Sequence, residues 1–214
     1  MTDTSKHEAT SEEREFELRA HIGAYWSGGR LFIGMYTFLI ASLVFSYFYL
    51  RSSNNGQLWR PHHVTAPLAY GWAIEICTVL TAALAIFGQS RLRRGAVNDW
   101  QVAGWTGVAS GLLALFFQCW ELTRLGFFPG SSGYASTFIG FAVMNIITLL
   151  ASTYWLETTL ARSLRLRTVH GGIDPELSDK PTARAFRADV ASMTYFQGFL
   201  VIASILLFSM FYLM

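Results

Sequence analysis

The sequence predicts an all-α integral membrane protein built as a bundle of five transmembrane helices. Of the 214 residues, 52% are hydrophobic and 15% aromatic, whereas only 14% are charged, against about 25% in typical soluble domains. The charged residues lie mostly outside a few long apolar runs. This composition excludes a disordered chain, a nucleic-acid-binding protein and a small secreted module held by disulfides.

Each apolar run is long enough to form one membrane-spanning helix. A helix needs about 20 predominantly apolar residues to cross ~30 Å of hydrocarbon. The segments that satisfy this requirement are 31–50, 67–89, 102–123, 134–157 and 190–213. Glu75 interrupts the second segment, and Glu121 lies near the end of the third. All five are much longer than the roughly 10-residue strands of a membrane barrel.

The remaining sequence divides into one short segment and one long domain. Residues 1–30 are polar and predict a cytoplasmic segment with a short surface helix, in which Thr10 and Glu13 have the spacing of a capping box. Because this polar stretch precedes the first apolar run, we do not interpret that run as a removable signal peptide. Residues 31–214 predict a single five-helix domain. We expect the fourth helix to continue through Arg167 and to end near Pro175.

The basic residues predict the orientation of the chain. Most of the 16 Lys and Arg residues lie in the amino-terminal segment and in the second and fourth loops, which five spans place on one side. Only Arg51, Arg60 and Arg124 fall on the other side. The positive-inside rule therefore predicts a cytoplasmic amino terminus and an external carboxy terminus.

The sequence predicts no catalytic group, metal site or cofactor in this chain. All five histidines lie outside the predicted spans, so histidine ligation of a haem within the bundle is not expected. Cys77 and Cys119 are isolated and are interpreted as small apolar residues. Gly104, Gly107 and Gly111 predict a helix-packing surface on the third span.

Two acidic residues within the spans are the main candidates for function. Ionisable groups at such depth are costly and usually face a partner inside the bundle. For Glu75 we consider a proton relay or a lipid-headgroup contact, and also a protonated carboxyl hydrogen-bonded between helices. Glu121 lies three residues before Arg124, which predicts either a surface ion pair with Arg124 or a tether between helices.

Three blocks of the sequence carry a family resemblance. Residues 34–51 resemble an opening block of the form G-M-x-x-F-L-x-S-E, followed by an aromatic run and Y-x-x-x-R. Residues 111–122 resemble a block of the form G-x-x-F-x-x-x-Q-x-x-E-[YW], and residues 133–140 are similar to the segment that opens the following helix. On these motifs, residues 30–214 resemble subunit III of the haem–copper oxidases (cytochrome c oxidases) in a five-helix form.

The sequence departs from that family at its titratable positions. Ser42 stands where the family has an acidic residue, and Ala142 and Asn145 stand where it has two histidines. Gln118 and Glu121 carry over. The resemblance therefore implies a divergent member in which these polar positions have a structural role.

The resemblance implies a non-catalytic subunit in the membrane of a bacterial cell. Its partners would be oxidase subunit I, subunit II and phospholipids, and the haem and copper would reside in those partner subunits. The basic cluster after the second span either binds an anionic headgroup such as that of cardiolipin or only sets the topology. The lipid or helix-interface candidates are Glu75, Gln118, Glu121, Arg124, Asn145, Arg91, Arg93 and Arg94.

Two other functions stay open on the sequence. One is a subunit-III-like accessory protein of a nitric oxide reductase, which the missing acid and histidines allow. The other is an independent five-span transporter or membrane enzyme that uses Glu75 and Glu121.

Overall fold

The computed structural model describes residues 3–54, 56–62, 64–169 and 181–214, and within these ranges it contains helices and no strands. Five of the helices are long and apolar enough to cross a membrane, which confirms the predicted helical class and indicates a multi-pass membrane protein. The elements are α1 (Asp3–Ser53), α2 (Gly56–Trp59), α3 (Leu68–Arg93), α4 (Val97–Arg124), α5 (Gly133–Val169), α6 (Pro181–Phe208) and the π-helical turn η2 (Ser209–Leu213).

The first helix is much longer than the sequence predicts. The prediction of a separate surface helix is wrong, because α1 runs without a break from Asp3 to Ser53. Thr10 lies inside this helix rather than at its cap. The segment between the polar and apolar parts contains glycines but no proline, and a glycine costs a helix only about 1 kcal/mol. One of these glycines, Gly29, is buried against Ser192 of α6, so packing there maintains the helix.

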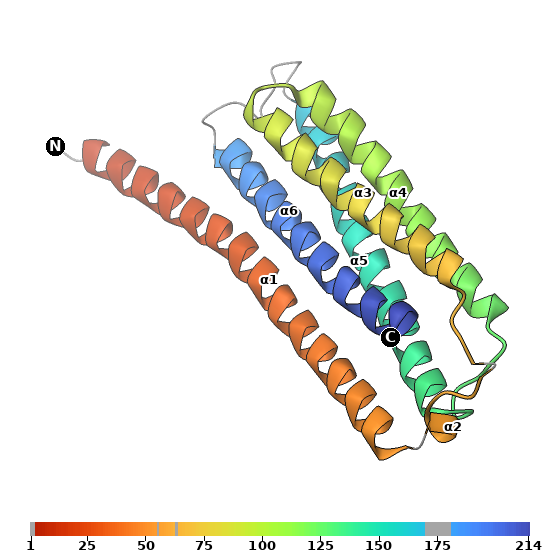
Figure 1. Ribbon diagram of the computed structural model, residues 1–214. Helices are drawn as coiled ribbons and strands as arrows, with labels where there is room; N and C mark the ends of the chain where they lie inside the picture. Colours follow the sequence, from red (N-terminus) through yellow and green to blue (C-terminus); the bar gives the residue numbers. More distant parts are fainter. Residues whose placement is uncertain (1–2, 55, 63, 170–180) are drawn as a thin grey trace.

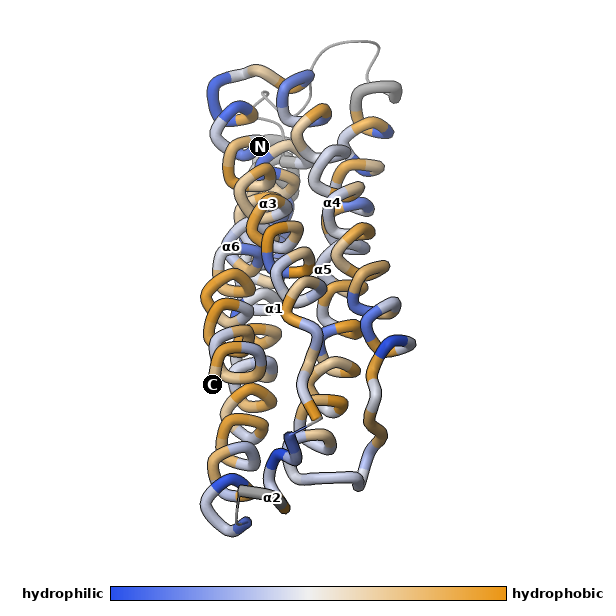
Figure 2. Tube along the Cα trace, turned by 45° about the vertical axis from the view of Figure 1, so that its right-hand side comes forward, coloured by the Kyte–Doolittle hydropathy of each residue, from blue (hydrophilic) through white to orange (hydrophobic). Residues whose placement is uncertain are grey.

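The other long helices form a bundle, with α1 on its outside. In Figure 1, α6 lies between α1 and α3, and α1 also contacts α5. Figure 2 shows hydrophobic residues along the long helices and hydrophilic residues around α2 and near the opposite end of the bundle. As expected, α5 extends past its apolar run to Val169, whereas Pro175 lies outside the described residues.

Glycines bring α3, α4 and α5 into close contact. Gly104, Gly107 and Gly111 of α4 face side chains of α5, which confirms the predicted packing surface. On α3, a Cβ atom at Gly88 would come within 2.8 Å of Trp100 Cε3. Because membrane helices associate largely through van der Waals packing, such small residues set the distance between them.

An aromatic cluster closes the end of the bundle that carries α2. Tyr47, Trp59, Tyr134 and Phe211 pack together there, and the Tyr47 and Trp59 ring centroids lie 4.9 Å apart. The Tyr134 hydroxyl donates a hydrogen bond to the Phe211 carbonyl oxygen at 2.7 Å. The Arg60 guanidinium lies 4.5 Å from the centre of the Tyr134 ring. These contacts join α1, α2, α5 and η2 at one end.

We predict that Gly88→Val destabilises the bundle by about 1–3 kcal/mol, because the added side chain overpacks a site that cannot widen. The neighbouring Trp100 has no exposed surface and so cannot move into solvent. Thermal unfolding in mild detergent measures the effect. Gly140→Val is the matched control, since no atom lies within 4 Å of a Cβ placed there. Equal stability of the two variants would contradict the packing described.

Candidate functional site

Four polar side chains from α4, α5 and η2 form a buried hydrogen-bonded chain. Asn145 Nδ2 donates to Gln118 Oε1 at 2.7 Å. Gln118 Nε2 in turn donates to Glu121 Oε2 at 2.8 Å. The Tyr212 hydroxyl lies 2.8 Å from both Glu121 carboxyl oxygens. We call these four residues the Glu121 network; Gln118 and Glu121 have no exposed surface.

Local structure explains why these residues meet. Gln118 and Glu121 are three residues apart on α4 and therefore share one face of the helix. Tyr212 reaches them from η2, where the backbone closes with a bond from the Met214 N–H to the Ser209 carbonyl oxygen at 3.1 Å. Gly71 of α3 leaves room for its ring, since a Cβ there would lie 2.6 Å from Tyr212 Cδ1. The network thus joins three elements and packs against a fourth.

Glu75 is a second buried carboxyl, and it lies close to the network. Ser204 Oγ of α6 donates to Glu75 Oε1 at 3.0 Å, which is a contact between helices. A cavity of about 10 Å³ separates Glu75 from Gln118, Asn145 and Tyr212. That volume is about enough for one water molecule. The arrangement favours the interpretation of Glu75 as a carboxyl hydrogen-bonded between helices over a lipid-headgroup contact.

The structure favours the tether for Glu121 over the ion pair with Arg124. No Lys or Arg among the described residues forms an ion pair with Glu121 or Glu75. The Arg124 guanidinium instead lies 5.8 Å from the centre of the Trp120 ring on the exposed side of α4. The spacing of three residues places Arg124 near Glu121 on the helix, but Arg124 is exposed whereas Glu121 is buried.

The predicted basic cluster lies away from this network, at the turn between α3 and α4. Arg91 Nε is 3.2 Å from Asp99 Oδ2 in an ion pair that is partly exposed. Arg93 and Arg94 are exposed. The eight sequence candidates therefore separate into the buried network with Glu75, the outlying Arg124 and the arginines at this turn.

A second polar cluster, around Asp189 of α6, was not predicted from the sequence. Trp155 Nε1 of α5 donates to Asp189 Oδ1 at 3.1 Å. Arg162 NH1 lies 3.4 Å from Asp189 Oδ2 and also hydrogen-bonds to the Tyr25 hydroxyl of α1. Ser192 Oγ donates to the Tyr25 carbonyl oxygen at 3.0 Å. We call these residues the Asp189 cluster; it joins α1 to α5 and α6.

The available sequence signal for this cluster was weak. Asp189 directly precedes the last apolar run and Arg162 follows the fourth, so both fall among the charged residues outside the predicted spans. In the structure they face each other because α5 and α6 both extend past their apolar runs. Charged residues at the ends of two adjacent spans are the pattern that indicates such a pair.

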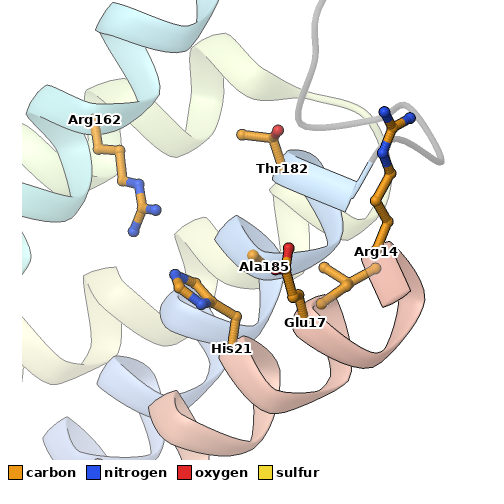
Figure 3. A pocket seen from close by; sticks show the side chains of 7 residues that line it. Arg14, Glu17, His21, Arg162, Thr182 and Ala185 are labelled. Carbon is orange, nitrogen blue, oxygen red and sulfur yellow. The ribbon is translucent and has the colours of Figure 1, made fainter. Parts of the chain in front are cut away.

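An open cavity of about 420 Å³ adjoins the Asp189 cluster between α1, α5 and α6. Figure 3 shows Arg162 on α5 and His21 and Glu17 on α1 around this space, with Thr182 and Ala185 on α6. The cavity has both basic and acidic walls, so its charge does not select one class of ligand. In the part of the chain that the structure describes, no three His, Cys, Asp or Glu residues are grouped as metal ligands.

Comparison with known proteins adds no assignment. No protein-family model matches the chain, and no curated protein sequence matches it.

We predict that Glu121→Ala lowers the free energy of unfolding by about 1–3 kcal/mol, because the Gln118 amide and the Tyr212 hydroxyl lose a buried acceptor. Glu121→Gln keeps one acceptor oxygen and should cost less. Glu157→Ala removes an exposed carboxyl of α5 and should change stability by no more than about 0.5 kcal/mol. Unfolding in mild detergent tests all three variants, and a Glu121→Ala protein as stable as Glu157→Ala would contradict the tether.

We also predict that Asp189→Ala loosens the first half of α1 without unfolding the bundle. The substitution removes the acceptor that holds Arg162, and Arg162 is one of the side chains that hold Tyr25. Backbone amide exchange near Tyr25 should become several-fold faster, as expected for local opening. Asp99→Ala is the control. It removes the ion pair between Asp99 and Arg91 at the turn between α3 and α4, and it should leave amide exchange in α1 unchanged. Equal exchange in both variants would rule out this attachment.

Proposed function

We propose that this chain is a non-catalytic, subunit-III-like component of a bacterial respiratory haem–copper oxidase of the cytochrome c type. It would cross the cell membrane five times, with its amino terminus in the cytoplasm and its carboxy terminus outside. It would pack beside subunit I and subunit II and stabilise subunit I during oxygen reduction and proton translocation. Haem and copper would be held by those partners, and this chain would contribute helix packing and phospholipid contacts.

The observation that carries the proposal is the hydrogen bonding among Gln118, Glu121 and Asn145. Gln118 and Glu121 stand in the second block of the resemblance, and Asn145 stands where the family has a histidine, 27 positions after Gln118. The three residues meet inside the bundle. A shared buried contact is what a structural role for these three positions requires. Such a role does not depend on the acid and the histidines that the family has and this chain lacks.

The outer face of α1 supports assembly in the membrane. Leu31, Met35, Phe38 and Phe45 are each 65–71% exposed and recur at spacings of four, three and seven residues along the helix. Ser42, on the same side, donates its hydroxyl to the Phe38 carbonyl oxygen of its own helix at 2.9 Å. This face is apolar and large, and such surfaces join to lipid chains or neighbouring helices through van der Waals contact.

The cavity beside Glu75 argues against an independent transporter that uses this residue. Its volume of about 10 Å³ gives room for a single water and not for a solute. A related assembly with nitric oxide reductase differs from the proposal in the haem type of the partner, so the same experiment separates the two.

The proposal predicts that the tagged chain, extracted from its native membranes in mild detergent, brings down haem and a large histidine-bearing subunit. A reduced-minus-oxidised spectrum and mass identification of the partners measure this. Asn145→Ala should lower the haem recovered per chain several-fold, because the network that orders α4 and α5 is broken. Arg94→Gln, at an exposed position, is the control and should recover haem like the unaltered chain.

Recovery of a haem-free homo-oligomer would overturn the oxidase assignment. Recovery of haem b without a copper-bearing partner would instead assign the chain to a nitric oxide reductase.

A further inference from the structure

A second small cavity lies inside the bundle, next to the one that separates Glu75 from the Glu121 network. Its volume is also about 10 Å³, which is about enough for one water molecule. Thr78 of α3 lines both cavities, so they adjoin each other at this side chain. We call them the Glu75 cavity and the Thr153 cavity. The polar side chains around the Thr153 cavity are Thr78, Thr81, Ser152, Thr153 and Gln197.

The Thr153 hydroxyl is a buried polar group that the protein itself does not satisfy. Thr153 of α5 is only 3% exposed, and its Oγ1 has no hydrogen-bond partner in the part of the chain that the structure describes. The hydroxyl lies against Gly111 of α4, another residue that lines the cavity, because a Cβ placed at Gly111 would overlap Thr153 Oγ1. A buried hydroxyl without a hydrogen bond destabilises a fold, and ordered water usually satisfies such groups.

Gln197 of α6 is a second polar side chain at this cavity whose hydrogen bonding is incomplete. It is 2% exposed, and its Nε2 donates to the Ser152 carbonyl oxygen at 3.4 Å, which is long for a hydrogen bond. An amide group has two N–H donors and a carbonyl oxygen, so most of its capacity is left for another partner. A water molecule in the cavity can bind Gln197 and Thr153 together.

The Glu75 cavity offers water a comparable set of partners. Ser204 donates to Oε1 of Glu75, and among the described residues no donor reaches Oε2. Asn145 donates to Gln118 through Nδ2, which leaves its Oδ1 available. The Thr78 hydroxyl donates to the Ile74 carbonyl oxygen at 2.8 Å, and its oxygen can still accept hydrogen bonds. A buried water typically makes about three hydrogen bonds, and these side chains supply them.

We propose that each cavity binds one water molecule, and that the two waters extend the Glu121 network through Glu75 and Thr78 to Thr153 and Gln197. The ligand class is water because each volume admits one molecule of that size and the walls are polar. The hydrated array joins α3, α4, α5, α6 and η2. The inference concerns the folded chain alone and goes beyond the oxidase assembly proposed above.

The array also bears on the proton relay considered for Glu75. In the turns that lead from Thr153 and Gln197 toward Asp189, the buried side chains are apolar, among them Leu156 of α5 and Met193 of α6. Apolar packing therefore separates the array from the Asp189 cluster. Proton exchange by Glu75 is confined to the array, which disfavours a relay across the bundle.

X-ray footprinting of the full chain in mild detergent detects such waters. Radiolysis of a bound water produces a hydroxyl radical that oxidises the nearest side chains, and mass spectrometry identifies them. The buried side chains to be measured are Leu149 and Leu200 at the Thr153 cavity, and Phe141 and Phe208 at the Glu75 cavity. They should be oxidised several-fold faster than Leu160 and Phe186, which are fully buried and line neither cavity.

Two variants test which side chains hold the waters. Thr153→Val keeps the shape of the side chain without its hydroxyl, so it should reduce oxidation several-fold at the Thr153 cavity and leave the Glu75 cavity unchanged. Thr78→Val should reduce oxidation at both cavities. Thr106→Val is the matched control, since Thr106 is exposed on α4 and donates to the Val102 carbonyl oxygen as Thr78 donates to that of Ile74. It should change neither cavity.

The thermal stability of Thr153→Val distinguishes bound water from a dry cavity by the sign of its effect. With water bound, the variant takes a partner from that water, and the midpoint of thermal unfolding should fall by about 2–4 °C. With a dry cavity, the substitution removes an unsatisfied hydroxyl, so the midpoint stays the same or rises.

Oxidation of the cavity residues no faster than that of Leu160 and Phe186 would overturn the proposal. An unchanged or raised midpoint for Thr153→Val would overturn it as well. Because haem recovery plays no part in these measurements, failure of the water sites and failure of the oxidase proposal remain distinguishable.

Discussion

The arrangement of the helices depends on how two buried carboxyl groups are satisfied inside the bundle. Hydrocarbon offers no water to polar groups, so Glu121 and Glu75 need protein partners at their depth. Glu121 obtains them from Gln118 of its own helix and Tyr212 of η2, and Gln118 binds Asn145 of α5. Glu75 obtains Ser204 of α6. These hydrogen bonds determine which helices are neighbours, and small residues between α3, α4 and α5 then let those helices pack closely.

The interactions that attach α1 to the bundle differ from those that join the four other long helices to one another. The Glu121 network lies within the bundle, whereas the Asp189 cluster reaches from α5 and α6 to Tyr25 on α1. The outer face of α1 remains exposed, and an apolar cavity of about 520 Å³ lies beside it along α6. A peripheral helix attached at a few points leaves an apolar surface that is open to contact with lipid chains or other helices.

The sequence was sufficient for features that depend on local composition. Long apolar runs form helices of membrane-spanning length. The glycines of α4 pack against α5 as predicted, because the lack of a side chain lets a neighbouring helix approach closely. It was insufficient where the partner is distant in the chain. Glu121 binds Tyr212, 91 residues away, rather than the nearby Arg124, and Asp189 lies just outside an apolar run. The length of α1 was missed because glycines weaken a helix without ending it when tertiary packing compensates.

The most direct test of this account is a double-mutant cycle between Asn145→Ala and Tyr212→Phe. Among the described residues, hydrogen bonds connect the two through Gln118 and Glu121. Unfolding free energies in mild detergent should show that the double variant loses less stability than the sum of the single losses, by about 0.5 kcal/mol or more. Strictly additive losses would show that the two ends act independently, and would contradict a connected network inside the bundle.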